Sequence, residues 1–196
     1  MKVLRAGSHR VMPWKNGGGS TTEIAVFPDG AGFDTFDWRV SMATVAADGP
    51  FSSFSDIDRT LAVLSGAGLR LTIDGRAPVS LTGADAPLAF PGDVSTHGAL
   101  IDGPIVDLNV MSRRGRVGHR MTRHGRMEPL DIAMDGAVNL IVSRSDDVTL
   151  TCGQRSLRLA TDDAVLISQP ATVRIAPDAG REMSVFAISF MPAQSA

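Results

Sequence analysis

The segment Met12–Glu23 concentrates side chains that could bind a ligand. It reads Met-Pro-Trp-Lys-Asn-Gly-Gly-Gly-Ser-Thr-Thr-Glu, which places a cation, an amide, a carboxylate and three hydroxyls close together. Three consecutive glycines suit positive φ angles or close approach to another surface. Lys15 and Asn16 stand directly before them, where they would place donors beside exposed backbone. The segment indicates a binding loop, and a glycine-rich turn into the first strand is the simpler alternative.

A second polar cluster, Phe51–Arg59, can be placed by its spacing. Six residues separate Arg59 from Gly66, and this spacing resembles the Glu-to-Gly part of the first metal-binding motif of cupins. Counting back from Arg59, Ser52 and Phe54 fall where the two histidines of that motif would lie. Pro91-Gly-Asp followed by His97 resembles the second cupin motif, and Asp162-Asp163 could be its degenerate counterpart in the second half.

These replacements argue against a metal and in favour of an anion. Arginine offers only donors, so it is a poor metal ligand, and one imidazole (His97) does not make a site. We therefore predict no metal and no cofactor. A guanidinium matches a carboxylate, and Arg39 is a candidate second inward cation. The alternative is a structural ion pair of Arg59 with a nearby acid, for which the candidates are Asp56, Asp58 and Asp107.

The hydrophobic pattern is that of β-strands. Trp38, Val40 and Met42 alternate with polar or small residues, and the same period of two recurs at 69–74 and 106–111. Further short runs, separated by Gly-, Pro- and Asp-rich turns, are Thr22–Phe27, Arg59–Leu64, Val79–Thr82, Val138–Val142, Val148–Cys152, Leu157–Leu159, Ala164–Ile167, Val173–Ile175 and Val185–Phe190. Many short strands at this spacing predict an all-β sandwich or barrel.

The arginine-rich stretch 112–129 separates two strand-rich segments. It is expected to be an irregular, solvated connector between an N-terminal half, residues 1–111, and a degenerate C-terminal half, residues 130–196. His119 and His124 lie five positions apart, which suits metal ligation on neither a helix nor a strand.

Composition sets the remaining limits. The chain has 196 residues, 19 basic and 21 acidic, with a net charge of −2, so nothing attracts it broadly to nucleic acid or anionic lipid. A single cysteine, Cys152, fits a reducing compartment. The N-terminus lacks the apolar run of a signal peptide, and no run is long enough to span a membrane. We expect a cytoplasmic protein that contacts neither nucleic acid nor membrane, with a homodimer as the candidate assembly.

Four ordered motifs within residues 12–111 resemble the HutD/Ves family. They are Pro13–Ile24, Phe36–Ala43, Gly49–Arg59 and Asp107–Met111. The resemblance implies a small bicupin, two cupin-type β-barrel halves in one chain, without the metal triad. It also implies an association with histidine utilisation, for which a sensing or limiting role has been proposed. At Ser55-Asp56 the sequence departs from the Pro-Gly turn expected of relatives, which should alter a loop and leave the pocket intact.

The resemblance also implies a set of ligand-binding residues drawn from the four motifs. They are Trp14, Lys15, Asn16, Glu23, Arg39, Ser41, Phe51, Ser52, Phe54, Asp58, Arg59, Asp107 and Asn109. The simpler roles are core packing for the three aromatic residues, turn hydrogen bonding for Asp58 and an ion pair with Lys15 for Glu23. Asp107 and Asn109 share a strand face, so both can reach one cavity.

Two functions compete for this site. The first is non-catalytic binding of a small carboxylate metabolite, for instance an acylated glutamate or another intermediate of histidine breakdown, in a metal-free pocket. The second is a metal-independent isomerase or hydrolase, with Glu23 or Asp107 as general base and Lys15 or Arg59 stabilising negative charge. No Ser/His/Asp or Cys/His arrangement stands out in the sequence, which favours the binder.

Overall fold

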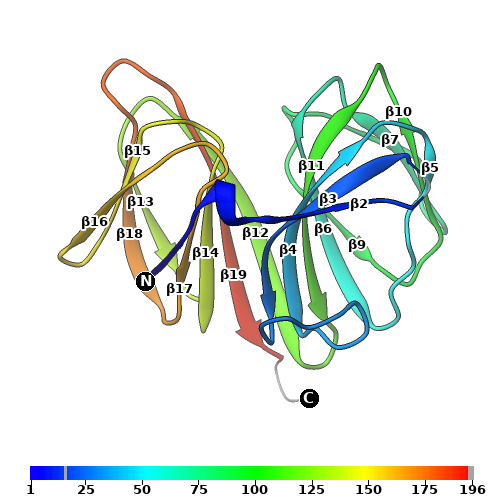
Figure 1. Ribbon diagram of the computed structural model, residues 1–196, viewed down its shortest axis with the longest axis horizontal. Helices are drawn as coiled ribbons and strands as arrows, with labels where there is room; N and C mark the ends of the chain where they lie inside the picture. Colours follow the sequence, from blue (N-terminus) through cyan, green and yellow to red (C-terminus); the bar gives the residue numbers. More distant parts are fainter. Residues whose placement is uncertain (16, 194–196) are drawn as a thin grey trace. The chain divides into compact units, whose positions relative to one another are not determined.

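The computed structural model describes residues 1–15 and 17–193, and nearly all its regular structure is β (Figure 1). Within these residues nineteen strands accompany one short 3-10 helix, η1 (Ala6–Ser8). The all-β prediction is confirmed. In the described part of the chain, no helix is both long and apolar enough to cross a membrane.

The chain divides into two compact units, which we describe separately. Among the described residues, the motif unit comprises Arg10–Gly118 together with Ala193. The C-terminal unit comprises Met1–His9 and His119–Pro192, so the first residues of the chain belong to the second unit.

The motif unit contains two antiparallel sheets. The larger has the order β2-β3-β4-β11-β6-β9, formed by Arg10–Pro13, Gly19–Phe27, Trp38–Val45, Ile105–Arg113, Ile57–Ser65 and Leu88–Pro91. The smaller has the order β5-β10-β7-β8, formed by Gly49–Pro50, Thr96–Leu100, Leu69–Ile73 and Val79–Leu81.

The C-terminal unit is also built from two sheets. One has the order β1-β17-β14-β19-β12, formed by Lys2–Leu4, Ala164–Ile167, Val138–Ser143, Met183–Pro192 and Val117–Arg126. The other has the order β13-β18-β15-β16, formed by Leu130–Met134, Ala171–Ala176, Val148–Cys152 and Arg155–Leu159.

The strand order repeats along the chain with an offset of eight. The order β4-β11-β6-β9 becomes β12-β19-β14-β17, and β5-β10-β7-β8 becomes β13-β18-β15-β16. This internal repeat is compatible with the two cupin-type halves implied by the sequence. The expectation of an irregular connector over 112–129 is wrong for Val117–Arg126, because these residues form β12.

The interiors of the two units differ in chemistry. In the C-terminal unit the alternate inward positions form one apolar cluster around Leu150, Val173 and Val185. In the motif unit a comparable cluster around Leu71 and Ile105 fills one part, but buried polar residues occupy alternate positions of β4, β6 and β11. Buried polar groups are costly unless they have partners, so these positions mark the candidate site.

Two of the three consecutive glycines are required for different reasons. Gly17 has a φ of +72°, in the left-handed region that favours glycine. Gly19 lies so close to β4 that an added Cβ would stand 2.1 Å from the carbonyl oxygen of Thr44 and 3.0 Å from the Trp14 ring. Both uses predicted for a glycine run are therefore present in this loop.

We expect Gly19→Ala to lower the free energy of unfolding by about 2 kcal/mol, because a backbone carbonyl cannot move aside as a flexible side chain can. Chemical unfolding of the variant measures this loss. Gly83→Ala is the matched control, since its added Cβ would meet nothing within 4 Å. Equal losses in the two variants would contradict the proposed close approach.

Candidate functional site

Three neighbouring strands place the candidate residues on one face of the larger sheet. Met111 on β11 lies directly opposite Arg39 on β4 and Arg59 on β6. Asn109 lies opposite Ser41 in the same way. Directly opposed residues point to the same side of a sheet, so the two arginines flank Met111 as neighbours.

A cavity of about 830 Å³ opens over this face, within the motif unit. Its lining includes ten of the residues predicted from the sequence, which are Trp14, Lys15, Arg39, Ser41, Phe51, Ser52, Phe54, Arg59, Asp107 and Asn109. The structure therefore brings residues from all four motifs together. Their role in binding stays a prediction.

Two of the described predicted residues, Glu23 and Asp58, are not among those around the cavity. Glu23 is absent from its lining and accepts a hydrogen bond from Arg39 Nε at 2.8 Å, so its ion-pair partner is Arg39 and not Lys15. Asp58 is half-exposed and pairs with Arg114 at 2.9 Å, which places it in a surface ion pair. Asn16 lies outside the described residues.

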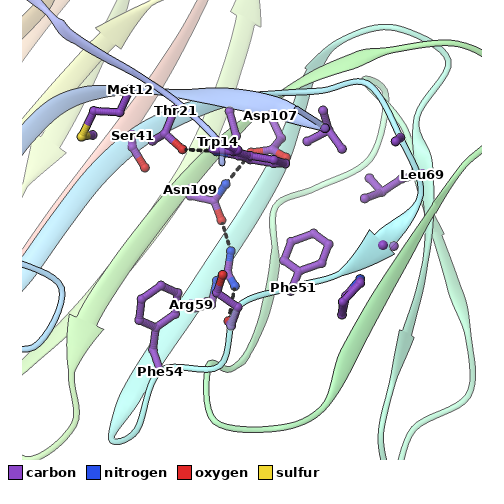
Figure 2. Close-up of a pocket in the computed structure, with 18 of the residues that line it drawn as sticks. Met12, Trp14, Thr21, Ser41, Phe51, Phe54, Arg59, Leu69, Asp107 and Asn109 are labelled. Atoms are coloured by element: carbon purple, nitrogen blue, oxygen red, sulfur yellow. Dashed lines mark hydrogen bonds between the residues drawn. The ribbon is translucent and has the colours of Figure 1, made fainter. Parts of the chain in front are cut away.

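Arg59 is the centre of a buried polar chain (Figure 2). Its Nη2 donates to Asn109 Oδ1 at 2.7 Å, and Asn109 Nδ2 donates in turn to Asp107 Oδ1. A longer contact of 3.5 Å joins Nη1 to the carbonyl oxygen of Ser52. Arg59 thus reaches Asp107 through an amide, and no direct ion pair of Arg59 with Asp56, Asp58 or Asp107 occurs among the described residues.

Aromatic rings surround the two guanidinium groups. The Cζ atom of Arg59 lies 4.9 Å from the ring centre of Phe51, 5.4 Å from that of Phe90 and 5.9 Å from that of Phe54. Figure 2 shows Phe51 and Phe54 on either side of Arg59. Such rings stabilise a cation without occupying its N–H groups. The rings therefore leave the N–H groups of Arg59 available to acceptors, of which Asn109 and Ser52 already engage two.

Each cavity arginine has one buried nitrogen without a hydrogen-bond acceptor among the described residues. These atoms are Nε of Arg59 and Nη2 of Arg39. Both side chains are almost fully buried, with 7% of Arg59 and 5% of Arg39 exposed. Buried donors are normally satisfied, so these two arginines of the cavity lining have hydrogen-bonding capacity that the described residues leave unused.

Burial also shifts the charge balance of the cavity. It raises the pKa of Asp107 from 3.8 to about 7, against the opposing attraction of Arg59. The pKa of Arg59 falls to about 10, because burial lowers it more than the attraction of Asp107 raises it, and the positive charge of Arg39 also lowers it. Near neutral pH the cavity therefore holds a cationic Arg59 and a carboxyl group, Asp107, that gains or loses its proton in this pH range.

The described residues do not supply a cupin-like ligand set. No group of three His, Cys, Asp or Glu side chains that could hold a metal ion occurs among residues 1–15 and 17–193. The position that would carry the metal-binding glutamate carries Arg59, whose charge disfavours a cation. The absence of a metal in the protein itself stays a prediction.

Sequence reasoning missed two useful members of the site. Met111 continues the period of two set by Asp107 and Asn109, and that pattern could have identified it. Phe33 lies in the loop between β3 and β4, with its ring centre 4.9 Å from Cζ of Arg39. No periodicity operates in a loop, so the sequence carried no signal for Phe33.

The fold is of the cupin type, and the motif unit contains an arginine-centred pocket. The structure is similar to a variant of oxalate decarboxylase from Bacillus subtilis, with a TM-score of 0.66 over 96% of this chain and 77% of that one. At 8% identity this likeness shows the fold alone.

A family model for HutD matches residues 6–185, and the chain belongs to the HutD family. The structure of HutD from Pseudomonas fluorescens SBW25 is 30% identical, with a TM-score of 0.81 over 98% of this chain and 99% of that one. A conserved protein of unknown function from Pseudomonas aeruginosa PAO1 is 33% identical, with a TM-score of 0.88 over 97% and 98%. The HutD/Ves resemblance is thereby confirmed.

Curated relatives match this chain over about half of its length. An uncharacterised 21.2 kDa protein encoded in the hutC 3' region of Pseudomonas putida is 41% identical over 111 residues, 57% of each chain. Protein Ves of Citrobacter koseri is 37% identical over 111 residues, 55% of this chain and 56% of that one. The matched stretch thus spans little more than half the length of these relatives.

Proposed function

We propose that the protein binds a small carboxylate metabolite in the cavity of the motif unit, without catalysing a reaction, and that it senses or regulates histidine utilisation. The observation that carries the proposal is the pair of buried, unsatisfied donors, Arg59 Nε and Arg39 Nη2. A carboxylate supplies acceptor oxygens and a negative charge to such donors.

The dimensions and lining of the cavity suit a metabolite. Its volume of about 830 Å³ lies within the usual range of small-molecule sites. Aromatic and aliphatic side chains form much of the wall, and Arg39, Arg59 and Asn109 lie on neighbouring strands of one sheet. An apolar wall with a few placed charges favours an organic anion over inorganic phosphate or chloride.

The link with histidine utilisation comes from relatives. The chain belongs to the HutD family, and the Pseudomonas putida relative is described as encoded beside hutC. The solved structure of HutD from Pseudomonas fluorescens carries the description "formate condition". Formate is the smallest carboxylate, so it is a suitable minimal probe for this chain.

A thermal-shift screen tests the proposal. We expect carboxylates from histidine breakdown, and formate at high concentration, to raise the melting temperature, because binding to the folded state alone stabilises it. The corresponding neutral amides should have no effect, since they lack the charge that Arg59 attracts. If amides and carboxylates stabilise the protein equally, the anion site is wrongly assigned.

One observation supports the alternative of a metal-independent isomerase or hydrolase. Asp107 is buried in the cavity, and its pKa near neutrality suits a general base. Glu23, the other candidate base, is engaged by Arg39. Turnover of any bound carboxylate by the purified protein, lost in Asp107→Asn, would favour the enzyme over the binder.

A further inference from the structure

Asp107 is a buried carboxyl group that simple anion binding leaves without a role. It is 1% exposed, and its Oδ1 accepts a hydrogen bond from the Asn109 amide. Within residues 1–15 and 17–193, no salt bridge or hydrogen bond joins it to an arginine or lysine, although Arg59 attracts it. A negatively charged group in this position would share the cavity with an incoming anion.

The charged groups around Asp107 come from four elements. Arg59 on β6 is joined to it through Asn109, and Arg39 on β4 is already paired with Glu23 on β3. Lys15, in the loop before β3, is exposed at the cavity lining. Among the described residues, Arg59 is therefore the cation whose charge lowers the pKa of Asp107, against the effect of burial.

A bound carboxylate would compete with Asp107 for this guanidinium. With Asp107 ionised, two negative charges would lie near one arginine in a poorly solvated cavity, where like charges repel strongly. With Asp107 protonated and neutral, the ligand is the one negative charge that interacts with Arg59 at this position. Oδ1 of the neutral acid can still accept the N–H of Asn109, so the polar chain persists in both states.

We propose that the cavity takes up a carboxylate and a proton together: the ligand binds at Arg59 while Asp107 accepts one proton from solvent. The new O–H bond forms on Asp107, and no other group changes its bonding. This inference rests on the proposed function, because it requires an anion to bind at Arg59. It makes binding sensitive to pH near neutrality.

The direction of the effect follows from the unliganded state. In the free protein the pKa of Asp107 is raised to about 7, so the protonated form becomes scarce above neutral pH. When only that form binds well, the affinity falls as much as tenfold for each pH unit above about 7 and levels off below it. Acidification therefore favours the complex.

Formate is the probe for the test, because it stays ionised throughout the range from about pH 6 to about pH 8.5. Its affinity is measured by fluorescence titration, since Trp14 lines the cavity. We expect binding to weaken at least tenfold over this range. Carbon-13 NMR of the Asp107 carboxyl should show a pKa that rises by about one unit or more at saturating formate. Sodium chloride at equal ionic strength should leave the pKa of Asp107 unchanged.

Asp107→Asn provides an uncharged side chain of the same shape that still accepts the Asn109 N–H. Its affinity for formate should be independent of pH and close to that of the wild type at low pH. The matched control is Asp102→Asn, an exposed position outside the cavity lining, which should keep the wild-type pH dependence. If Asp107→Asn fails to fold, the NMR titration of the wild type still shows whether the pKa of Asp107 rises when formate binds.

The outcomes separate this inference from the function on which it rests. If formate binds, and binding is lost in Arg59→Met, but Asp107 titrates unchanged, the coupled uptake of a proton is wrong and the anion site stands. If formate at high concentration perturbs neither Trp14 nor Arg59, the proposed function and the inference fall together.

Discussion

Arg59→Met is expected to weaken binding of a carboxylate ligand by roughly 30- to 1000-fold, or about 2–4 kcal/mol. The variant keeps an unbranched apolar side chain among Phe51, Phe54 and Phe90, but it removes every N–H donor. The ligand would lose the buried Nε donor and most of the positive charge of the cavity. Calorimetric titration of both proteins measures the change.

Arg114→Met is the matched control for this result. Arg114 is about half-exposed and pairs with Asp58 and Asp93 at the surface, so its removal should leave ligand affinity unchanged. Unfolding of Arg59→Met should show the structural role of the arginine separately. Since Arg59 attracts ionised Asp107, we expect the loss of stability to be larger near pH 8 than near pH 6. Unchanged affinity with severe destabilisation would make Arg59 a structural residue.

Asp107→Asn is expected to stabilise the protein relative to the wild type as the pH rises. The pKa of Asp107 is 3.8 in an unfolded chain and about 7 in the folded protein, where burial raises it. The folded state therefore holds the proton to higher pH, and the stability of the wild type falls between these values. The difference between the proteins should grow by about 1.4 kcal/mol per pH unit, to about 4 kcal/mol at most.

Chemical unfolding of both proteins from about pH 4 to about pH 8 tests this dependence. The difference in the free energy of unfolding isolates Asp107, because all other titrating groups are common to the two chains. It should be small at pH 4 and reach its plateau above about pH 7. A constant difference across the range would show that Asp107 keeps an ordinary pKa, and a decreasing one would show that it is stabilised in the ionised form.

Much of the fold could be predicted from the sequence because many of its strands have one buried, apolar face and one exposed, polar face. The alternation of Leu69, Leu71 and Ile73 with polar residues corresponds to β7, in which all three are buried and Arg70 and Thr72 are exposed. The Arg-rich stretch could not be recognised as a strand because it lacks such a face. In β12 most side chains are exposed or partly buried, so its alternation is too weak to indicate a strand.

The site was predictable wherever strand parity or spacing applied. The period of two placed Asp107 and Asn109 on one face, and the cupin spacing placed Arg59 in the interior. The same parity argues against Asp58, since it precedes Arg59 and points to the opposite face of β6. That position was assigned from the resemblance alone, and the structure places it in a surface ion pair.

Contacts between strands could not be derived from the sequence. The simpler role considered for Glu23 is an ion pair with Lys15, but Glu23 pairs with Arg39 instead. Glu23 lies opposite Ser41, two residues from Arg39 on β4, and the register of β3 against β4 shifts between Glu23 and Ala25. A bulge of this kind changes which side chains oppose one another. The link from Arg59 through Asn109 to Asp107 also depends on the register of β6 against β11, which only the folded chain fixes.

A crystal structure of the protein soaked in formate tests the central claim most directly. The account predicts a carboxylate oxygen within hydrogen-bonding distance of Arg59 Nε, the buried donor that the described residues leave unsatisfied. The polar chain through Asn109 to Asp107 should remain intact beside it. Formate bound only outside the cavity, with Arg59 Nε satisfied by a protein group, would contradict the assignment of this cavity as a carboxylate site.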